Sequence, residues 1–468
     1  MCMAFLWLKN LFKGKDKTLT LSSPFYPSDK KVRSFTYSFN IDDFKKDSDV
    51  YSDALARISL AKAMASYNGD GPYESRDRHI RAFHQTLGFT HIESNKYYQS
   101  KPQYNSVGIQ IGYRFIRKGL VKMPLLSVAI RSGHYEREWD SNFRFGLEGH
   151  HEGFLEAAKM AYSFLLEYIE KHQLNRYRQM KIWISGYSRG GAVTNLLAAK
   201  LKSIASNLED AVFDAPPLPL KKKAKLEIYA YTFESPSPAI IGKPIKGFEG
   251  IFNIFSSSDV VCFTPFNFMG FTRYGTSIEI NAHFGNVKTF EQYLPDFELK
   301  RFCVKTLSKL SIQEVEQQTS AAEFIQEMLR FFEKDMHLTR KDYVEKYQFG
   351  LSKIVAFYKA GGAKGLTLGG LSKLKLLAML ASSSIFTKEL HSFIRKSDYE
   401  ISDEDIAKMG QSLYRLLVDS MKYDRSYKLM HLITLKESGG AMFQYHCAEL
   451  IYAYMNEHPL KKESVDEH

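Results

Sequence analysis

The sequence predicts an α/β fold, in which a mostly parallel β-sheet carries helices on both faces and is followed by a helical insertion or cap. Between about residues 123 and 281, short apolar runs typical of buried strands alternate with longer stretches of helical periodicity. From about residue 310 onward the strand signals vanish and helical stretches follow. The 468 residues, 44% of them hydrophobic, are enough for one large domain with an insertion or for two domains.

The central region contains the clearest elements. Its apolar runs are short and rich in Ile, Val, Leu and aromatic residues, whereas the stretches between them repeat apolar residues on one side, as Phe154, Ala158 and Leu165 do. We expect strands at 125–130, 181–185, 226–233 and 250–255, and helices at 153–172 and 192–205. Strands that alternate with helices favour parallel pairing, because each parallel connection must cross the sheet and the crossing helix covers a face.

Four regions follow from this pattern. Residues 1–120 are mixed and polar, with helical periodicity at 51–67, and read as an N-terminal mixed or helical extension. Residues 121–290 hold the predicted α/β core. Residues 291–430 are expected to be a helical insertion, serving either as a cap or lid or as an interaction domain. Residues 431–468 end the chain with a further helix.

A Gly-x-Ser-x-Gly motif, Gly186-Tyr187-Ser188-Arg189-Gly190, lies between a predicted strand and a predicted helix. A nucleophilic serine needs a sharp strand-to-helix turn that projects its hydroxyl from the edge of the sheet. The turn is crowded, so the residues two before and two after the serine must lack side chains, and Gly186 and Gly190 meet that demand. We therefore predict Ser188 as a nucleophile; the alternative is a serine in a glycine-rich turn or helix N-cap.

Such a serine needs a base, and the base needs a carboxylate to orient it. In α/β-hydrolases the chain order is Ser, then Asp or Glu, then His. Asp259 follows the predicted strand that ends at Phe255, where a carboxylate can reach the same rim of the sheet as the nucleophile. The alternative is an aspartate that caps a turn. Among the histidines downstream of Asp259, those at positions 283, 337, 391, 431, 446 and 458 are the candidates for the base.

These segments resemble the class 3 lipase family, and more closely its bacterial lipase-like branch. The resemblance covers about residues 120–285. Residues 182–197 are similar to the family's elbow and following helix, 253–265 to its "N-x-x-D-x-V-P" segment, and 151–154 to its "H-x-G-F" helix start. Residues 229–236 resemble its "Y-T-F-G-S-P" strand, with Glu234 in place of the usual glycine.

The resemblance implies roles for further residues. His446 begins an amphipathic segment similar to the "H-x-P-E-x-Y" ending of the bacterial relatives, so we predict it as the base, returned to the core by residues 431–468. His283, which follows Asp259 and a strand-like run, is the alternative. The N–H of Arg189 at the helix start is one predicted oxyanion donor. The similarity of residues 128–133 to "V-A-F-R-G-T" assigns the other donor to Ser132 or Gly133.

The function implied is that of a serine hydrolase, a lipase or esterase that cleaves carboxylic esters of lipids through an acyl-enzyme and needs no cofactor. Alternatives are a phospholipase, thioesterase or acyltransferase with the same residues, or an inactive hydrolase scaffold that binds a membrane or a partner. A metal site at His134, His150, His151 and Glu152 is not expected, since their spacing lacks the one-turn helical geometry of His-Glu-x-x-His.

Charge and cysteine content restrict the partners and the compartment. The net charge of +12 favours anionic partners, and the run Lys221-Lys222-Lys223 reads either as a solvated loop or as a site of attraction to anionic membranes. The sequence has no recognisable nucleic-acid-binding motif and gives no oligomeric state. Four scattered cysteines suggest a reducing compartment. We expect a cytoplasmic protein, or one secreted without a conventional signal peptide, with peripheral membrane association as an option.

Overall fold

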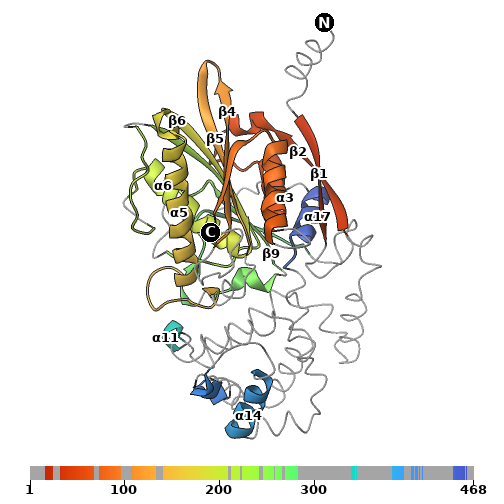
Figure 1. Ribbon diagram of the computed structural model, residues 1–468, viewed down its shortest axis with the longest axis vertical. Coiled ribbons are helices and arrows are strands. Elements are labelled where there is room, and N and C mark those ends of the chain that lie inside the picture. Colours follow the sequence, from red (N-terminus) through yellow and green to blue (C-terminus); the bar gives the residue numbers. More distant parts are fainter. Residues whose placement is uncertain are drawn as a thin grey trace, which may run out of the picture.

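A seven-stranded β-sheet forms the centre of the molecule (Figure 1). The computed structural model describes residues 16–24, 32–67, 73–95, 107–132, 141–208, 212–221, 224–241, 246–257, 259–265, 269–282, 339–342, 344, 382–394, 402–404, 406–408, 410–411, 414, 446–458 and 460. The strand order is β11-β9-β7-β6-β5-β4-β3. The strands are β3 (Thr90–Asn95), β4 (Ile109–Lys118), β5 (Val121–Ile130), β6 (Gln179–Tyr187), β7 (Lys225–Phe233), β9 (Ile251–Ser256) and β11 (Thr276–Ile280).

Five of these strands are parallel, which confirms the predicted fold class. β5, β6, β7, β9 and β11 run in the same direction, and β3 and β4 extend the sheet in antiparallel pairing beside β5. The carboxyl ends of parallel strands meet at one edge of a sheet, so the loops that follow β5, β6, β7 and β9 converge there. In Figure 1 the β4–β5 turn is at the top, and these carboxyl ends point downward.

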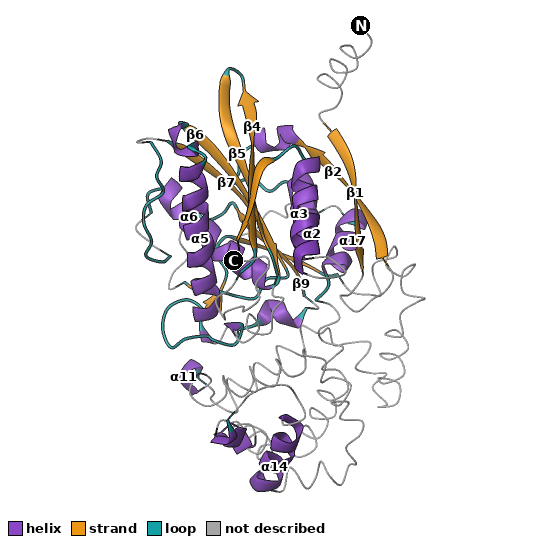
Figure 2. Cartoon of the chain, in the orientation of Figure 1, coloured by secondary structure: helices purple, strands orange, loops and turns teal. Residues whose placement is uncertain are grey.

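Helices cover both faces of the sheet (Figure 2). On one face α5 (Glu152–Lys171) and α6 (Arg189–Ala205) share a buried core with Ile182 and Ile184 of β6. On the other face α2 (Asp53–Tyr67), α3 (Tyr73–Thr86) and α17 (Ala448–Glu457) share a second core with Trp183. Neighbouring residues of β6 thus point into opposite cores, and a strand buried on both sides must be apolar along its length.

Smaller elements complete the described chain. β1 (Asp16–Pro24) and β2 (Val32–Asn40) form an antiparallel pair, as do β8 (Ala239–Ile240) and β10 (Phe271–Thr272). Three 3₁₀ turns are η1 (Ile41–Lys45), η2 (Leu174–Arg176) and η3 (Val260–Phe263), and two further helices are α11 (Arg340–Asp342) and α14 (Ser383–Ile394). Among the described helices, none combines the length and the apolar character needed to cross a bilayer.

The structure corrects the predicted boundary at residue 120. β3 and β4 lie before it, yet they pair onto β5 in the central sheet, and α2 packs in the core shared with β6. Residues 1–120 are therefore not an extension beside the sheet, because their described strands and helices supply one edge and much of one face. The alternating apolar residues Ile109, Ile111, Tyr113 and Phe115 of β4 were the signal for this in the sequence.

The predicted insertion at 291–430 is described only in part. α11 and α14 lie beyond the carboxyl ends of the parallel strands (Figure 1). The Arg340 guanidinium of α11 donates hydrogen bonds to the carbonyls of Gly146 (2.8 Å) and Phe145 (2.8 Å) in the loop before α5. It also stacks on the ring of Phe271, with its central carbon 4.6 Å from the ring centroid. This arginine therefore links the insertion to the core at that edge; most other residues of 291–430 lie outside the described part.

Candidate active site

Ser188 occupies the sharp turn between β6 and α6. Its backbone φ is 56° and its ψ is −129°, a conformation that residues with a side chain rarely adopt. The Ser188 N–H donates to the carbonyl of Phe233 (2.9 Å), which fixes the turn against the end of β7. The Ser188 hydroxyl accepts no hydrogen bond from the N–H groups at the start of α6. The side chain therefore does not cap the helix, which was the alternative that the sequence left open.

The flanking glycines are required by the space around the turn. A Cβ on Gly186 would lie 2.2 Å from the carbonyl oxygen of Gly190, and one on Gly190 would lie 2.6 Å from the carbonyl oxygen of Ile130. Both contacts are far shorter than a carbon and an oxygen tolerate, and both involve backbone atoms that cannot rotate away. The strand, the turn and the helix can approach this closely only because these two residues lack side chains.

We expect Gly186→Ala to lower the free energy of unfolding by about 3 kcal/mol, at the upper end of the usual cost of overpacking. The reason is the 2.2 Å clash with backbone, which only a shift of β6 or α6 can relieve. Urea denaturation of wild type and variant measures the effect. Gly149→Ala is the control: its Cβ would meet nothing within 4 Å, and its φ of 64° alone gives an expected loss of about 1 kcal/mol. Equal losses in the two variants would contradict the explanation.

His446 joins the hydroxyl to a carboxylate. Its Nε2 is 2.7 Å from Ser188 Oγ, and its Nδ1 is 2.6 Å from Asp259 Oδ2. With Asp259 ionised, Nδ1 carries the proton that is donated to the carboxylate, which leaves Nε2 to accept from the serine O–H. The ring also stacks on Tyr187, with centroids 5.0 Å apart and an interplanar angle of 25°. The structure thus brings together the three residues that the sequence proposed as nucleophile, acid and base.

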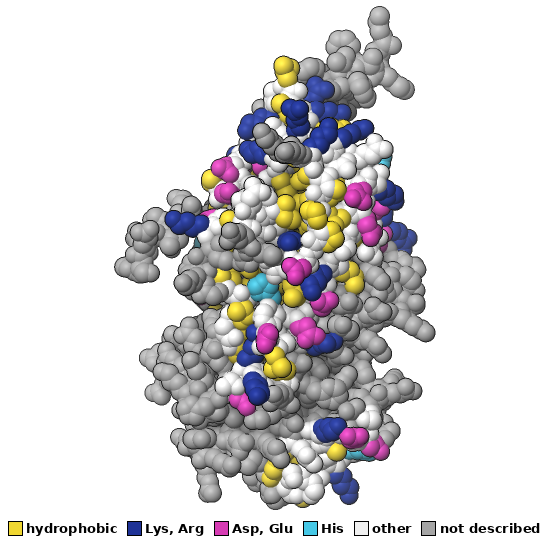
Figure 3. Space-filling view, turned by 90° about the vertical axis from the view of Figure 1, so that its left-hand side faces the viewer, with side chains coloured by type: hydrophobic (Ala, Val, Ile, Leu, Met, Phe, Trp, Pro, Cys, Tyr) yellow, Lys and Arg dark blue, Asp and Glu magenta, His cyan; other side chains and the backbone are white. Residues whose placement is uncertain are grey.

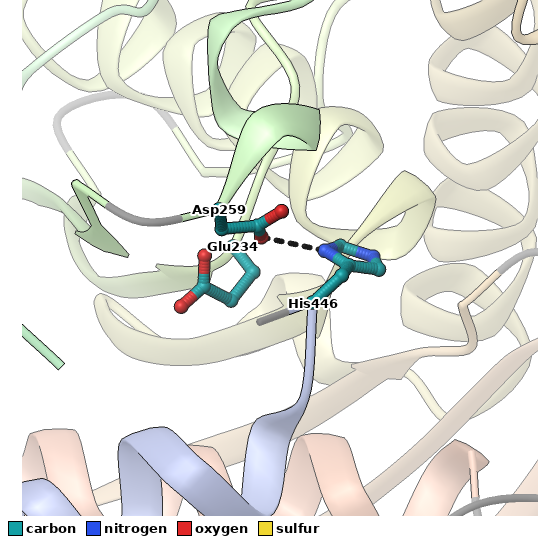
Figure 4. A group of neighbouring side chains, drawn as sticks. All are labelled: Glu234, Asp259 and His446. Carbon is teal, nitrogen blue, oxygen red and sulfur yellow. Dashed lines mark hydrogen bonds and ion pairs between the residues drawn. The ribbon is translucent and has the colours of Figure 1, made fainter. Parts of the chain in front are cut away.

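The carboxylate lies in the loop after β9. The Asp259 carboxyl group points toward His446 (Figure 4). Asp259 is fully buried, and its other oxygen, Oδ1, accepts a hydrogen bond from the Val261 N–H at 2.9 Å. Burial alone would raise the pKa of Asp259, but the His446 ring, a hydrogen bond from Glu234 and the Val261 N–H together hold that pKa below its usual value. Asp259 is therefore held in its charged form, the form that can stabilise a protonated imidazole.

The helix that follows His446 positions it. In α17, the apolar side chains of Leu450, Ile451 and Met455 are buried in the core that α2 and the sheet share. The chain therefore arrives at the carboxyl edge of the sheet just before the helix begins, and Cys447, the extended residue ahead of the helix, directly follows His446. Both His446 and Ser188 keep a small contact with solvent, since the His446 side chain is 12% exposed and Ser188 is 6% exposed.

The structure describes two of the three residues that the sequence predicts as oxyanion donors. The Arg189 N–H follows Ser188 at the start of α6, and the Arg189 side chain is buried, with its guanidinium donating to Asn142 Oδ1 (3.0 Å). Ser132, two residues past the end of β5, is also buried beside this edge. Gly133, the other candidate for the second donor, lies outside the described residues. So does His283, the alternative base.

A second serine–histidine pair does not form a site. His84 Nε2 lies 3.0 Å from Ser127 Oγ, and His84 Nδ1 bonds Gln110 (2.8 Å), but all three side chains are fully buried. Burial lowers the pKa of His84 to about 3, so its imidazole is a very weak base. No substrate can reach this pair without unfolding the core. Ser188 differs because its histidine lies at a partly open edge.

The two histidines before α5 have structural contacts. His151 is the N-cap of α5, stacks on Phe154 with centroids 3.9 Å apart, and bonds the Asn142 carbonyl through Nε2 (3.1 Å). His150 accepts from the Ile240 N–H (3.0 Å) and contacts the Tyr274 hydroxyl (3.2 Å). Their ring nitrogens thus bond different protein groups. Within the described residues, the one trio of candidate metal ligands is Glu234, Asp259 and His446, which includes the predicted acid (Asp259) and the predicted base (His446).

Glu234 is a member of the site to which the sequence assigned no role. It directly follows β7, is fully buried, and has a φ of 46°. Figure 4 shows Asp259 between Glu234 and His446. The only signal in the sequence was its position, a charged residue at the end of an apolar strand. The cluster holds a cation as well: the Arg273 guanidinium donates to the carbonyls of Ser235 and Cys262 beside the two carboxyls.

Comparisons with known proteins find similarity to lipases. The family model described as lipase (class 3) matches residues 127–268. The chain is similar to the triacylglyceride lipase of Rhizomucor miehei, with 19% identity, a TM-score of 0.30, and coverage of 48% of this chain and 79% of that one. The native propeptide complex of the same organism's lipase is 16% identical, with a TM-score of 0.27 and coverage of 48% of this chain and 67% of that one. A lipase from Rhizopus microsporus var. chinensis is 15% identical, with a TM-score of 0.29 and coverage of 50% of this chain and 77% of that one. No curated protein matches.

The segment that matches the family model runs from β5 to the residues before β10. It includes the elbow with Ser188 and the loop with Asp259, whereas His446 lies beyond it. The narrower assignment to a bacterial branch stays a prediction. The part of the chain that carries the elbow and the Asp259 loop, residues 127–268, therefore matches the class 3 lipase family.

Proposed function

We propose that the chain is a serine hydrolase that cleaves carboxylic esters of lipids through a covalent acyl-enzyme. One observation carries the proposal: a single imidazole, that of His446, lies within hydrogen-bond distance of both Ser188 Oγ (2.7 Å) and Asp259 Oδ2 (2.6 Å). This arrangement of nucleophile, base and orienting acid is what acyl transfer requires. An inactive scaffold would have no reason to keep all three in contact at an accessible edge.

The first half of the reaction forms the acyl-enzyme. His446 Nε2 takes the proton of the Ser188 hydroxyl while Oγ attacks the ester carbonyl carbon. The negative charge that develops on the carbonyl oxygen is stabilised by the Arg189 N–H, with Ser132 or Gly133 as the second donor. Asp259 stabilises the imidazolium. When the intermediate collapses, His446 gives its proton to the leaving alkoxide and the alcohol departs.

The second half releases the acid. His446 takes a proton from water, whose oxygen attacks the acyl carbon, and a second tetrahedral intermediate forms in the same oxyanion site. Its collapse breaks the bond to Ser188 Oγ, and the proton returns from His446 to the serine. The carboxylic acid product leaves, and each group is back in its starting state. No step requires a metal or a redox cofactor.

Lipid esters are the proposed substrates because the core is of the lipase family and because the insertion at 291–430 is expected to cap the carboxyl edge. Arg340 supports the cap, since it ties the insertion to the carbonyls of Phe145 and Gly146 on that side of the molecule. A cap with apolar helices would shield a long acyl chain from water. The phospholipase, thioesterase and acyltransferase alternatives use the same chemistry and differ in acyl donor or acceptor.

The test combines labelling with a substrate panel. A fluorophosphonate probe should modify the protein, and peptide mapping should find the adduct on Ser188. Purified enzyme is then given short and long p-nitrophenyl esters, emulsified triacylglycerol, phosphatidylcholine, an acyl thioester, and an ester with a competing alcohol. The proposal expects the highest kcat/KM on long-chain or emulsified carboxylic esters. Labelling at another residue would remove the proposed nucleophile, and a preference for the phospholipid or the thioester would select an alternative.

Peripheral contact with anionic membranes is a separate proposal. Figure 3 shows Lys and Arg side chains gathered at the end of the molecule that is far from α14. The β4–β5 turn lies at that end, with Leu120 fully exposed and Val121 half-exposed between Arg117, Lys118 and Lys122. An apolar tip with flanking cations suits an anionic lipid surface.

Co-sedimentation with vesicles tests the membrane proposal. The protein should sediment with vesicles that contain phosphatidylserine, and the bound fraction should fall as salt is raised from 50 to 500 mM, values chosen to shorten the screening length below about 5 Å. Phosphatidylcholine vesicles are the control. Equal binding to the two kinds of vesicle, or binding to neither, would contradict an electrostatic membrane contact.

A further inference from the structure

A second buried carboxyl, that of Glu234 at the end of β7, lies beside Asp259, and the proposed reaction does not use it. One carboxyl oxygen of Glu234, one of Asp259 and a ring nitrogen of His446 lie within 4.8 Å of one another. The Glu234 and Asp259 side chains are both fully buried. Two carboxyl groups held this close and away from water repel each other when both are ionised, so one of them carries a proton.

The contacts decide which of the two carries it. Asp259 faces the donors expected around an anion: the His446 Nδ1–H at 2.6 Å and the Val261 N–H at 2.9 Å. The Glu234 carboxyl accepts a long, forked hydrogen bond from the Ser256 N–H (3.2 and 3.3 Å) and the weakly donating thiol of Cys262 (2.8 Å). The better donors lie around Asp259, so Asp259 is the anion and Glu234 the acid.

The charges of the cluster agree. The groups that face Glu234 are Asp259 and Cys262 from the loop after β9, Arg273 from the segment after β10, and His446 from the segment before α17. With Glu234 neutral, one anion (Asp259) is matched by one cation (Arg273). With Glu234 ionised, the buried cluster would hold an unmatched negative charge. Burial and the charge of Asp259 accordingly raise the pKa of Glu234 well above its usual range.

We propose that Glu234 is a positioning residue: a protonated acid that donates a hydrogen bond to Asp259 and so keeps the Asp259 carboxylate ionised and aimed at His446. It acts through Asp259 and does not touch the substrate. The conformation supports a role beyond packing, because Glu234 holds a φ of 46° that would suit glycine better. This inference rests on the proposed serine mechanism.

Two substitutions separate hydrogen bonding from packing. Glu234→Gln keeps an N–H donor for Asp259 and the shape of the side chain, and we expect kcat/KM to stay within about threefold of wild type. Glu234→Met keeps a similar length but removes the donor, and we expect kcat/KM to fall about 10- to 100-fold through kcat, as for loss of a hydrogen bond to a charged group. KM should change little in both variants, since the side chain lies behind Asp259.

The pH profile gives a readout that packing would not move. Without a donor, the anionic form of Asp259 is less stable, so its pKa rises. The steep low-pH part of the acid limb of kcat/KM, where Asp259 takes up a proton, should therefore shift to higher pH in Glu234→Met, by about one unit, and stay in place in Glu234→Gln. Glu227→Gln and Glu227→Met are the matched controls. They make the same changes at the other end of β7, where Glu227 pairs with Lys181 and Lys225, and should leave the profile unchanged.

Infrared spectroscopy tests the protonated state directly, even if Glu234→Met does not fold. At neutral pH the wild-type protein should show the carbonyl stretch of a protonated carboxyl group, which disappears in Glu234→Gln and persists in Glu227→Gln. Absence of that band, or a Glu234→Met enzyme with the wild-type rate and acid limb, would overturn the proposal. Ser188→Ala distinguishes a failure of this inference from a failure of the serine mechanism. If Ser188→Ala remains active, the serine mechanism is wrong. If Ser188→Ala is inactive while Glu234→Met has wild-type activity, only the inference about Glu234 is wrong.

Discussion

Ser188→Ala should lower kcat/KM for a carboxylic ester about 10⁵- to 10⁶-fold, and fluorophosphonate labelling should vanish. The hydroxyl that His446 Nε2 contacts at 2.7 Å is the only atom in this arrangement that could form the acyl-enzyme. Activity above the uncatalysed rate should persist at a low level, because the oxyanion donors and the binding surface are untouched. Initial-rate kinetics on a p-nitrophenyl ester measure the loss.

Ser203→Ala is the matched control. Ser203 lies on α6, the helix that directly follows Ser188. It is buried, and its hydroxyl donates a hydrogen bond to the Lys200 carbonyl (2.8 Å). Its replacement removes the same atoms without touching His446, so rate and labelling should match wild type. Activity in Ser188→Ala within about tenfold of wild type would mean that another group carries the acyl transfer.

The elbow was predictable because everything that specifies it is local. The strand, the glycines and the helix occupy one short stretch, and each imposes its own requirement on residue type. The structure agrees in detail, since β6 ends at Tyr187, α6 begins at Arg189, and the clash distances at Gly186 and Gly190 explain the two glycines. The position of Asp259 followed from strand order alone, because every parallel strand ends at the same edge.

The choice of histidine could not be reached by the same local reasoning. His446 comes 187 residues after Asp259 in the chain, and nothing in its immediate sequence fixes where it lies. Its place depends on the docking of α17 into the core beside α2 and the sheet, a contact between segments nearly 400 residues apart. Only the resemblance to lipase-like endings favoured His446 over His283, which lies outside the described residues.

The N-terminal strands show a different limit. Apolar residues alternate clearly along β4, but this alternation does not predict which sheet the strand joins. Its partner is β5, reached by the tight turn at Gly119, whose φ is 62°. Residues 1–120 are predicted to be an extension because the first strong apolar run in the sequence, which becomes β5, is taken as the start of the core. An antiparallel edge strand such as β3, half-exposed along much of its length, gives a weaker signal than the buried strands beside it.

The role proposed for Glu234 could not be predicted from the sequence. A glutamate in place of glycine at the end of β7 reads as a departure from the family's strand, and sequence alone offers no partner for it. Its partner, Asp259, follows the neighbouring strand β9, and the two meet because β7 and β9 are adjacent and parallel. A buried charge-bearing residue without a visible partner is a reason to inspect the adjacent strand end.

Asp259→Asn should lower kcat about 10³- to 10⁴-fold while leaving the fold and KM nearly unchanged. Asp259 now accepts hydrogen bonds at both oxygens, from Val261 N–H at Oδ1 and from His446 Nδ1–H at Oδ2. An asparagine has only one acceptor oxygen. If that oxygen stays on the Val261 N–H, the amide NH₂ faces His446 and forces Nδ1 to accept. The imidazole proton then sits on Nε2, which points a donor at Ser188 and can no longer take its proton.

The variant should also react slowly with the fluorophosphonate probe, yet label at Ser188 to completion given time, since the nucleophile is present and only its activation is lost. Asp47→Asn is the control, an exposed aspartate whose carboxylate accepts from the Asp49 N–H, and it should behave as wild type. If Asp259→Asn kept a wild-type kcat, Asp259 would not be the orienting acid. Glu234, the other carboxyl within reach of His446, would then be the residue to test in that role, because a buried imidazolium must have a negative charge beside it.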